Sequence, residues 1–172
     1  AEKIAFHLQS LNVDYFAVAY TSEGVALRNA GITKPILVLH PQPLNFKTII
    51  DNCLEPSLYS PKILNDFLQI TTDLNQENYP VHIKFNTGLN RLGFWENDVD
   101  YIVSKLSLNN SIYIKSIFSH LAASEDHNEK DFTNTQISSF KTISDNLINA
   151  IGYKPLLHIC NTSGVLNYPD AH

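Results

Sequence analysis

The sequence predicts an α/β fold built on a parallel sheet, and in particular an incomplete parallel (β/α) barrel of the TIM type. Short apolar runs alternate with amphipathic helical segments along the whole chain of 172 residues, which is typical of parallel sheets. Two arrangements fit this alternation, an open doubly wound sheet and an eight-stranded barrel. No GxGxxG or GxxxxGK[ST] phosphate loop follows any of the runs, and this absence disfavours the open doubly wound sheet.

Six apolar runs are expected to form strands, which is about six of the eight strands of a barrel. The runs are 14–20, 36–40, 55–60, 82–86, 112–120 and 156–161. The first and last strands of the barrel are then missing. We therefore expect residues 1–172 to form one partial (β/α)8 barrel domain, as a fragment of a longer chain would.

Helices are expected between these strands, with start and stop signals at their ends. The segments are 21–31, 60–74, 96–108 and about 131–150, with a further helix at the start of the chain. Thr21 and Ser22 offer capping hydroxyls for one helix. Ser60 is a good N-cap with Pro61 at the first helical position, and Gly152 is a good left-handed stop.

Composition and charge exclude several classes of protein. Hydrophobic residues make up 44% and charged residues 17%, which indicates a globular domain rather than disorder. The formal net charge of -5 and the lack of a dense Lys/Arg cluster argue against a nucleic-acid partner. No apolar run is long enough for a membrane span, and the first residues do not resemble a signal peptide. Cys53 and Cys160 have no metal-binding spacing and are expected to be free thiols in a reducing compartment, the cytoplasm.

Arg91 and Lys84 are the first candidate site residues, because functional residues of a barrel gather at the carboxyl ends of its strands. Arg91 lies in the loop NTGLNRLG, whose glycines and asparagines suit tight turns. A guanidinium there suits a flat oxyanion, since it offers a rigid fork of donors and stays charged. An ion pair between Arg91 and Glu96 is the structural alternative.

His120 is the second candidate, at the end of the strand expected over 112–120. A histidine at a strand end is either a catalytic group or a satisfied hydrogen-bonding residue. The loop after it, SEDHNEKD, is rich in acids but has no regular ligand spacing, so we expect a solvated acidic loop and no metal site.

The third candidate region is His158 with the segment Asn161-Thr162-Ser163-Gly164, which follows the last predicted strand. Its hydroxyls, amide and backbone N–H groups are donors that suit a phosphate, and late barrel loops commonly bind phosphate. A helix cap is the alternative, and the two roles are compatible because a capped helix start also attracts anions.

Four ordered motifs resemble the alanine racemase family along nearly the whole chain. YFAVAYTSEGVALRNAGITKPILVLH resembles the stretch after the cofactor lysine of the family, and HIKFNTGLNRLGF is similar to its Lys-x-Asp-Thr-Gly-Met-x-Arg-Leu-Gly motif. IFSHLAASED and HICNTSGVLNYPDAH resemble its Thr-His-Phe-Ala-x-Ala-Asp and Asn-Ser segments. The resemblance implies a pyridoxal 5'-phosphate enzyme on an eight-stranded barrel with a second, β-rich domain that is absent from this chain.

The resemblance also implies a role for each matching residue. Arg91 would hydrogen-bond the phenolic oxygen of the cofactor near the substrate carboxylate, and Lys84, carbamylated in some relatives, would hold Arg91. Residues implied to contact or support the cofactor are Leu39, Arg91, His120, His158, Asn161 and Thr162, with Arg91 and His120 as the catalytic pair. Asn86 stands where the family usually has Asp, which removes a carboxylate near Lys84, and Thr162 replaces Ser but keeps its hydroxyl.

The implied activity is the interconversion of L- and D-alanine, which supplies D-alanine for peptidoglycan, by a homodimer with shared active sites. The Schiff-base lysine of the family would precede Ala1 and its tyrosine base would follow His172, so this fragment is predicted to be inactive alone. The alternatives are another barrel-type enzyme with this cofactor, such as a broad-specificity racemase or a decarboxylase, and a non-catalytic cofactor-binding or assembly domain.

Overall fold

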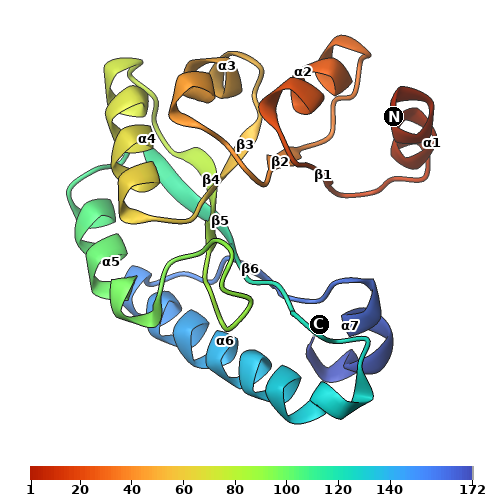
Figure 1. Cartoon of the computed structure of the whole chain (residues 1–172). Coiled ribbons are helices and arrows are strands. Elements are labelled where there is room, and N and C mark those ends of the chain that lie inside the picture. Colours follow the sequence, from red (N-terminus) through yellow and green to blue (C-terminus); the bar gives the residue numbers. More distant parts are fainter. Residues whose placement is uncertain (172) are drawn as a thin grey trace.

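A computed structural model describes residues 1–171 and contains one six-stranded parallel sheet, curled into part of a barrel (Figure 1). The strands are β1 (Phe16–Val18), β2 (Ile36–Val38), β3 (Glu55–Leu58), β4 (Tyr79–Lys84), β5 (Ile112–Phe118) and β6 (Leu156–His158). They pair in sequence order, β1-β2-β3-β4-β5-β6, as successive β–α units of a barrel do. The predicted incomplete barrel is confirmed.

Helices follow the strands and cover the convex side of the sheet (Figure 1). The α-helices are α1 (Glu2–Ser10), α2 (Thr21–Asn29), α3 (Phe46–Asp51), α4 (Pro61–Asp73), α5 (Val99–Ser107), α6 (Lys130–Ile151) and α7 (Thr162–Asn167). Short 3-10 turns occur at Pro43–Asn45, Glu96–Asp98, His127–Glu129 and Pro169–Ala171. The short helix α3 was not predicted, since six residues give too little apolar periodicity to detect.

The helix ends partly follow the predicted signals. Ser60 caps α4 by accepting a hydrogen bond from the N–H of Ile63, and Gly152 ends α6 in the left-handed region at a φ of 79°. The predicted hydroxyl cap of α2 is wrong. The backbone N–H groups of Ala19 and Tyr20 instead donate to the carboxylate of Glu23, so an acid in the first turn replaces the hydroxyl.

Several strands differ in length from the predicted runs. The run 14–20 yields only the three residues of β1, because hydrophobicity alone does not fix how many residues pair with a neighbour. The strand β4 starts at Tyr79, earlier than predicted, since Tyr79 pairs with Ile112 of β5. Each predicted strand nevertheless contains or overlaps an observed one.

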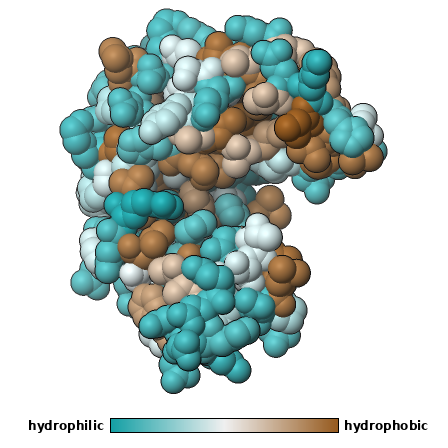
Figure 2. All heavy atoms as spheres, turned by 45° about the vertical axis from the view of Figure 1, so that its right-hand side comes forward, coloured by the Kyte–Doolittle hydropathy of each residue, from teal (hydrophilic) through white to brown (hydrophobic). Residues whose placement is uncertain are grey.

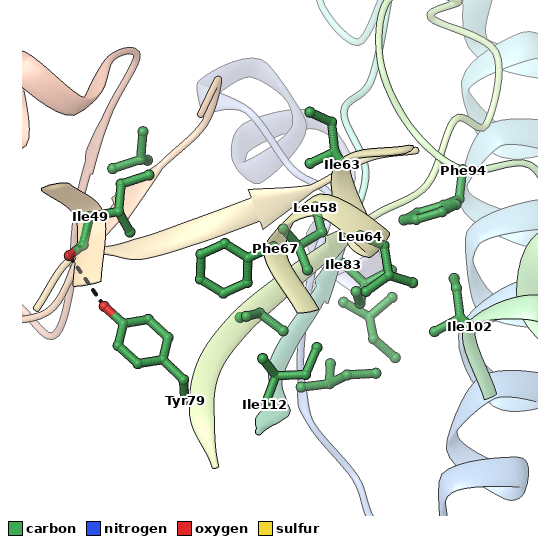
Figure 3. Close-up of a cluster of buried hydrophobic side chains, with 14 of the residues drawn as sticks. Ile49, Leu58, Ile63, Leu64, Phe67, Tyr79, Ile83, Phe94, Ile102 and Ile112 are labelled. Atoms are coloured by element: carbon green, nitrogen blue, oxygen red, sulfur yellow. Dashed lines mark hydrogen bonds between the residues drawn. The ribbon is translucent and has the colours of Figure 1, made fainter. Parts of the chain in front are cut away.

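The hydrophobic core lies between the sheet and its helices (Figure 3). Leu64 and Phe67 of α4 are fully buried and face Leu58 of β3 and Ile83 of β4. Tyr79 joins the core with its ring and donates its hydroxyl to the carbonyl groups of Ile49 and Leu54. This packing fixes the outer face of the sheet and therefore the direction of the side chains on its inner face.

The inner face of the sheet is more polar than the outer one. Alternation along β4 buries Val81 and Ile83 in the core and directs His82 and Lys84 to the inner face. The concave side of the molecule is open and shows both hydrophobic and polar side chains (Figure 2). This inner face leads to the carboxyl ends of the strands, where the candidate residues lie.

Candidate functional site

The carboxyl ends of β4, β5 and β6 bring three of the predicted regions to one edge of the sheet. The strand register places Lys84 opposite Phe118, and Phe118 opposite His158. The backbone N–H of Ser119, next to His120, donates to the carbonyl oxygen of His158 at 3.2 Å. The regions around residues 84, 120 and 158, far apart in sequence, are therefore neighbours at this edge.

The loop that carries Arg91 is held by the side chain of Asn86. The oxygen Oδ1 of Asn86 accepts hydrogen bonds from the N–H of Gly88 at 3.1 Å and of Asn90 at 2.9 Å. Its amide Nδ2 donates to Oδ1 of Asn90 at 2.9 Å. Asn90 has a φ of 55°, a conformation that asparagine tolerates better than most residues. Arg91 therefore follows a turn with a fixed backbone.

The far end of the loop returns to the strand it left. The N–H of Phe94 donates to the carbonyl of Lys84, and the N–H of Asn86 donates to the carbonyl of Phe94, both at 2.8 Å. Gly93 has a φ of 143°, and a Cβ atom there would lie 2.4 Å from the backbone nitrogen of Asn86. The close approach of the two loop ends thus requires glycine at position 93.

Lys84 is buried, with an exposed fraction of 6%, and its ammonium lies 5.7 Å from the ring centroid of Phe118. Within residues 1–171 its Nζ makes no hydrogen bond or ion pair. Burial first, and the charge of Arg91 second, hold the pKa of Lys84 below its ordinary value. A lysine of this kind has a larger neutral fraction than a solvated one, which increases its reactivity as a nucleophile.

Arg91 is exposed, and among the described residues its guanidinium has no hydrogen-bond or ion-pair partner. The alternative in which Arg91 pairs with Glu96 is not realised, since no salt bridge of residues 1–171 joins them. Its donors are therefore available to a ligand. This is the arrangement expected of an arginine that binds a flat oxyanion.

His120 is half-buried at the end of β5, and its imidazole makes no hydrogen bond within the described part of the chain. Its backbone carbonyl accepts a hydrogen bond from the amide of Gln136 at 3.4 Å. Burial, followed by the charges of Arg91 and Lys84, lowers the pKa of His120. The two cations are thus close enough to influence this imidazole, and the three side chains form one cluster.

His158 lies flat against Phe118, with ring centroids 4.8 Å apart and an interplanar angle of 6°. Its Nε2 is 3.1 Å from the hydroxyl of Ser116. Desolvation, and then the nearby His82, lower the pKa of His158 to about 4, so the ring is neutral near pH 7. Phe118 was not singled out in the sequence, although the register with Lys84 and His158 makes it the shared support of both.

Asn161 and Thr162 lie at the start of α7. The side chain of Asn161 caps α7, because its Oδ1 accepts from the N–H of Gly164 at 2.9 Å, and it also accepts from the hydroxyl of Ser124 at 2.6 Å. The capping alternative is thus realised, and a contact of Asn161 with a cofactor stays a prediction. Thr162 is exposed, with its hydroxyl free to bind a ligand within the described residues.

Leu39 is half-buried directly after β2, also at the carboxyl end of the sheet. Its backbone N–H donates to the carbonyl of Val18 at 2.8 Å, which continues the pairing of β1 and β2. One strand, β3, separates β2 from β4, which carries Lys84, and within residues 1–171 no hydrogen bond joins Leu39 to the cluster around Lys84. Its position at the same edge agrees with the prediction but does not test it.

The described part of the chain shows neither a metal-binding group of side chains nor a membrane-spanning helix. Within residues 1–171 no group of three or more His, Cys, Asp or Glu side chains is arranged to hold a metal ion. No helix of that range is both long and apolar enough to cross a membrane. The loop after His120 forms a turn in which the carboxylate of Asp126 accepts from the N–H of Asn128.

The fold and the site together define a class: a (β/α) barrel domain with cationic side chains gathered at the carboxyl ends of its strands. A family model described as alanine racemase, N-terminal domain, matches residues 1–172. The chain belongs to this family.

Curated relatives carry the same name. The alanine racemase of Thermodesulfovibrio yellowstonii is 36% identical over 161 residues, which cover 94% of this chain and 42% of that protein. The alanine racemase of Treponema denticola is 32% identical, over 99% of this chain and 46% of that protein. The chain therefore spans less than half the length of these relatives.

Solved structures agree with the fold. An alanine racemase from Clostridium difficile 630 in complex with cycloserine superposes with a TM-score of 0.91 at 30% identity, covering 99% of this chain and 47% of that one. The alanine racemase from Corynebacterium glutamicum gives a TM-score of 0.87 at 27% identity, with the same two coverages. An alanine racemase from Bartonella henselae with covalently bound pyridoxal phosphate gives 0.86 at 24% identity, covers 100% of this chain and 48% of that one, and shows the fold alone.

Proposed function

We propose that this chain is the cofactor-binding barrel region of an alanine racemase that interconverts L- and D-alanine with pyridoxal 5'-phosphate and supplies D-alanine for peptidoglycan. The family membership and the relatives named alanine racemase support this function. The observation that carries it is the cluster of Arg91, Lys84 and His120 at the carboxyl edge of the sheet.

The donor set of this cluster fits pyridoxal phosphate. The phenolic oxygen of the cofactor is a flat, delocalised oxyanion, and the unpartnered guanidinium of Arg91 suits such a group. When bound, the cofactor draws electrons from the Cα–H bond of the attached amino acid and so makes that proton removable. Removal and return of the proton on opposite faces inverts the stereocentre.

We propose the following roles for the chain's own residues. Arg91 binds the phenolic oxygen and lies near the substrate carboxylate, and the neutral imidazole of His120 packs beside the ring. His158 supports His120 from behind. The remaining cofactor contacts are proposed for Asn161 and Thr162 near the ring and phosphate and for Leu39 against the cofactor.

Lys84 is proposed to hold Arg91, and the charge of the Lys84 side chain depends on whether it is carbamylated. A carbamate on Lys84 turns a cation beside Arg91 into an anion that orients the guanidinium. The lowered pKa of Lys84 supports this role, because only the neutral amine adds carbon dioxide. Asn86 supplies no carboxylate nearby, because its side chain is a neutral amide. That amide is hydrogen-bonded within the loop.

The full-length protein is proposed to be a cytoplasmic homodimer with active sites shared between subunits. Cys53 and Cys160 are free thiols, which agrees with a reducing compartment. Light scattering of the purified full-length protein tests the dimer, and a monomer at micromolar concentration that racemises alanine would contradict shared sites.

A racemisation assay of the full-length protein on alanine, serine, lysine and ornithine tests the proposal. We expect alanine to be the preferred substrate, together with a visible absorbance band that borohydride removes. A preference for lysine or ornithine, or loss of carbon dioxide, would assign the barrel to another enzyme with this cofactor. No band and no turnover would favour the non-catalytic domain.

A further inference from the structure

A line of hydrogen-bonded polar side chains crosses the inner face of the sheet toward the candidate site. The hydroxyl of Tyr15 and the Nε2 of His82 each lie 2.9 Å from the same oxygen, Oε2 of Glu55. The Nδ1 of His82 lies 2.6 Å from the hydroxyl of Ser116, and that hydroxyl lies 3.1 Å from Nε2 of His158. The line therefore joins β3, β4, β5 and β6 and ends at the carboxyl edge of the sheet.

The three inner members of this line are buried and have no part in the function proposed above. The exposed fractions are 9% for Glu55, 2% for His82 and 1% for Ser116. Polar groups at such depth cost stability unless they are hydrogen-bonded, and a half-satisfied network is worse than an apolar one. Here the hydroxyl of Ser116 and both imidazole nitrogens of His82 all have hydrogen-bond partners.

The chemistry of the groups restricts the direction of the hydrogen bonds. A carboxylate can only accept, so both Tyr15 and Nε2 of His82 donate to Glu55. Burial and Glu55 raise the pKa of Tyr15, which keeps its phenol protonated. With Nε2 protonated, neutral His82 has a lone pair on Nδ1, which accepts the one hydrogen of Ser116. The Ser116 oxygen can then only accept from His158, whose Nε2 must carry its hydrogen.

The reverse direction requires a buried imidazolium at His82 and does not agree with the distances. Hydrogen bonds from O–H donors are shorter than those from N–H donors, with usual values of about 2.7 and about 2.9 Å. The 2.6 Å contact between Ser116 and His82 fits a hydroxyl donor, and the 3.1 Å contact between His158 and Ser116 fits an N–H donor. All donors of the line therefore point toward Glu55.

We infer that Glu55, His82 and Ser116 are positioning residues that hold His158 in its Nε2–H tautomer and so leave a lone pair on its Nδ1 at the carboxyl edge of the sheet. Within residues 1–171 no hydrogen bond involves Nδ1 of His158. The stack on Phe118 fixes the plane of the ring, and the bond to Ser116 fixes its rotation. This inference deepens the proposed function and rests on it for the identity of the site.

The tautomer is measurable by long-range 1H–15N NMR of the full-length protein labelled with 15N-histidine, with His158→Gln used to assign the signals. We expect Nε2 of His158 to carry the hydrogen in the unmodified protein. Ser116→Ala removes the link and lets both tautomers populate, which shifts both nitrogens toward an average. A wild-type Nδ1–H tautomer, or an unchanged tautomer in Ser116→Ala, would overturn the inference.

Three further variants separate positioning from packing. Glu55→Gln keeps an oxygen where Tyr15 and His82 both donate, so the His158 tautomer should be retained, whereas Glu55→Ala should release it. Tyr15→Phe is the matched control, because Tyr15 only donates to the same carboxylate oxygen and removing its hydroxyl leaves the donor from His82 in place. A change of tautomer in Tyr15→Phe as large as in Ser116→Ala would show a packing effect and contradict the relay.

Turnover separates a failure of this inference from a failure of the proposed function. The tautomer is read without cofactor or substrate, so a protein that fails to racemise alanine but holds His158 as Nε2–H refutes only the function. In an active enzyme we expect Ser116→Ala to lower kcat about tenfold with little change in KM, as for loss of transition-state stabilisation. A released tautomer with unchanged kcat would overturn the assignment of His158 to the site.

Discussion

The amide of Asn86 donates to the side-chain oxygen of Asn90 at 2.9 Å, while the oxygen of Asn86 accepts the backbone N–H of the same Asn90. These two asparagines thus pair within the turn that precedes Arg91. The oxygen of an aspartate at position 86 could accept the same backbone hydrogen bonds, but it could not donate. The departure from the family motif at this position therefore leaves the turn intact and changes its charge.

A double-mutant cycle on these two residues tests the pairing. We expect Asn86→Asp and Asn90→Asp each to change the free energy of unfolding by less than about 1 kcal/mol. In Asn90→Asp the amide of Asn86 already donates to position 90, and in Asn86→Asp the amide of Asn90 can rotate to donate to the new carboxylate. The double variant places two carboxylates together and should lose about 1 kcal/mol more than the sum. Denaturant unfolding of the three variants measures the coupling, and additivity within error would contradict the contact.

Replacing Arg91 with lysine should affect catalysis and leave stability unchanged. A single ammonium cannot supply the two parallel donors of a guanidinium, so we expect kcat/KM for alanine to fall roughly 100-fold. The free energy of unfolding should stay within about 0.5 kcal/mol, because the exposed guanidinium has no partner in the described chain. Normal racemisation by the full-length variant would remove Arg91 from the site.

Arg28 provides a matched control for that substitution. Its guanidinium donates to the backbone carbonyls of Ile32, Lys34, Asn52 and Cys53. Arg28→Lys should therefore cost about 1–3 kcal/mol of stability through the lost hydrogen bonds. Its effect on kcat should be small. The two arginines would then show opposite patterns in the same pair of measurements.

Sequence patterns were sufficient to predict the fold and the loop that carries Arg91. Strands that pack under helices give short apolar runs, and loop glycines and asparagines mark turns, so the six strands and the loop before Arg91 were predictable. The line from Glu55 to His158 was not. Its successive members are 27, 34 and 42 residues apart in sequence, and only the strand register brings them together.

Lys84 should form a carbamate more readily than a solvated lysine. The neutral amine nitrogen bonds to the carbon of carbon dioxide, and one proton leaves to solvent. Because burial and Arg91 lower the pKa of Lys84, the neutral amine is more abundant at a given pH, so the adduct should form at lower pH than on surface lysines. Carbon NMR with labelled bicarbonate measures it in the full-length protein.

The control for the carbamate is a lysine that also lies beside an aromatic ring. Lys105 lies 5.3 Å from the ring centroid of Tyr101 and is half-buried on α5. Lys84→Arg should abolish the protein carbamate signal at neutral pH, and Lys105→Arg should leave it unchanged. No signal in the wild type between pH 7 and pH 9 would show that Lys84 supports Arg91 as an amine.

Gly93→Ala should destabilise the protein and displace the loop that carries Arg91. An added Cβ would lie 2.4 Å from the nitrogen of Asn86 and 2.5 Å from the carbonyl carbon of Phe85, at a φ of 143°. We expect a loss of about 3 kcal/mol. Gly152→Ala is the matched control, because its φ of 79° costs about 1 kcal/mol while no atom lies within 4 Å of the added Cβ. Equal losses would contradict the close approach at residue 93.

Protonation of His158 should make stability depend on pH in the acid range. Its pKa is lowered from 6.5 to about 4 by desolvation and by His82, so between these values the unfolded chain binds a proton that the folded chain does not. Stability must then rise with pH across this window, and the contribution is lost as the pH falls from about 6.5 toward about 4. Denaturant unfolding of the full-length protein at pH 7.5 and pH 4.5 measures the loss. His158→Gln can still hydrogen-bond Ser116 but does not titrate, so it should lose less stability than the wild type over the same interval, and an equal loss would show that His158 is already accessible to protons in the folded state.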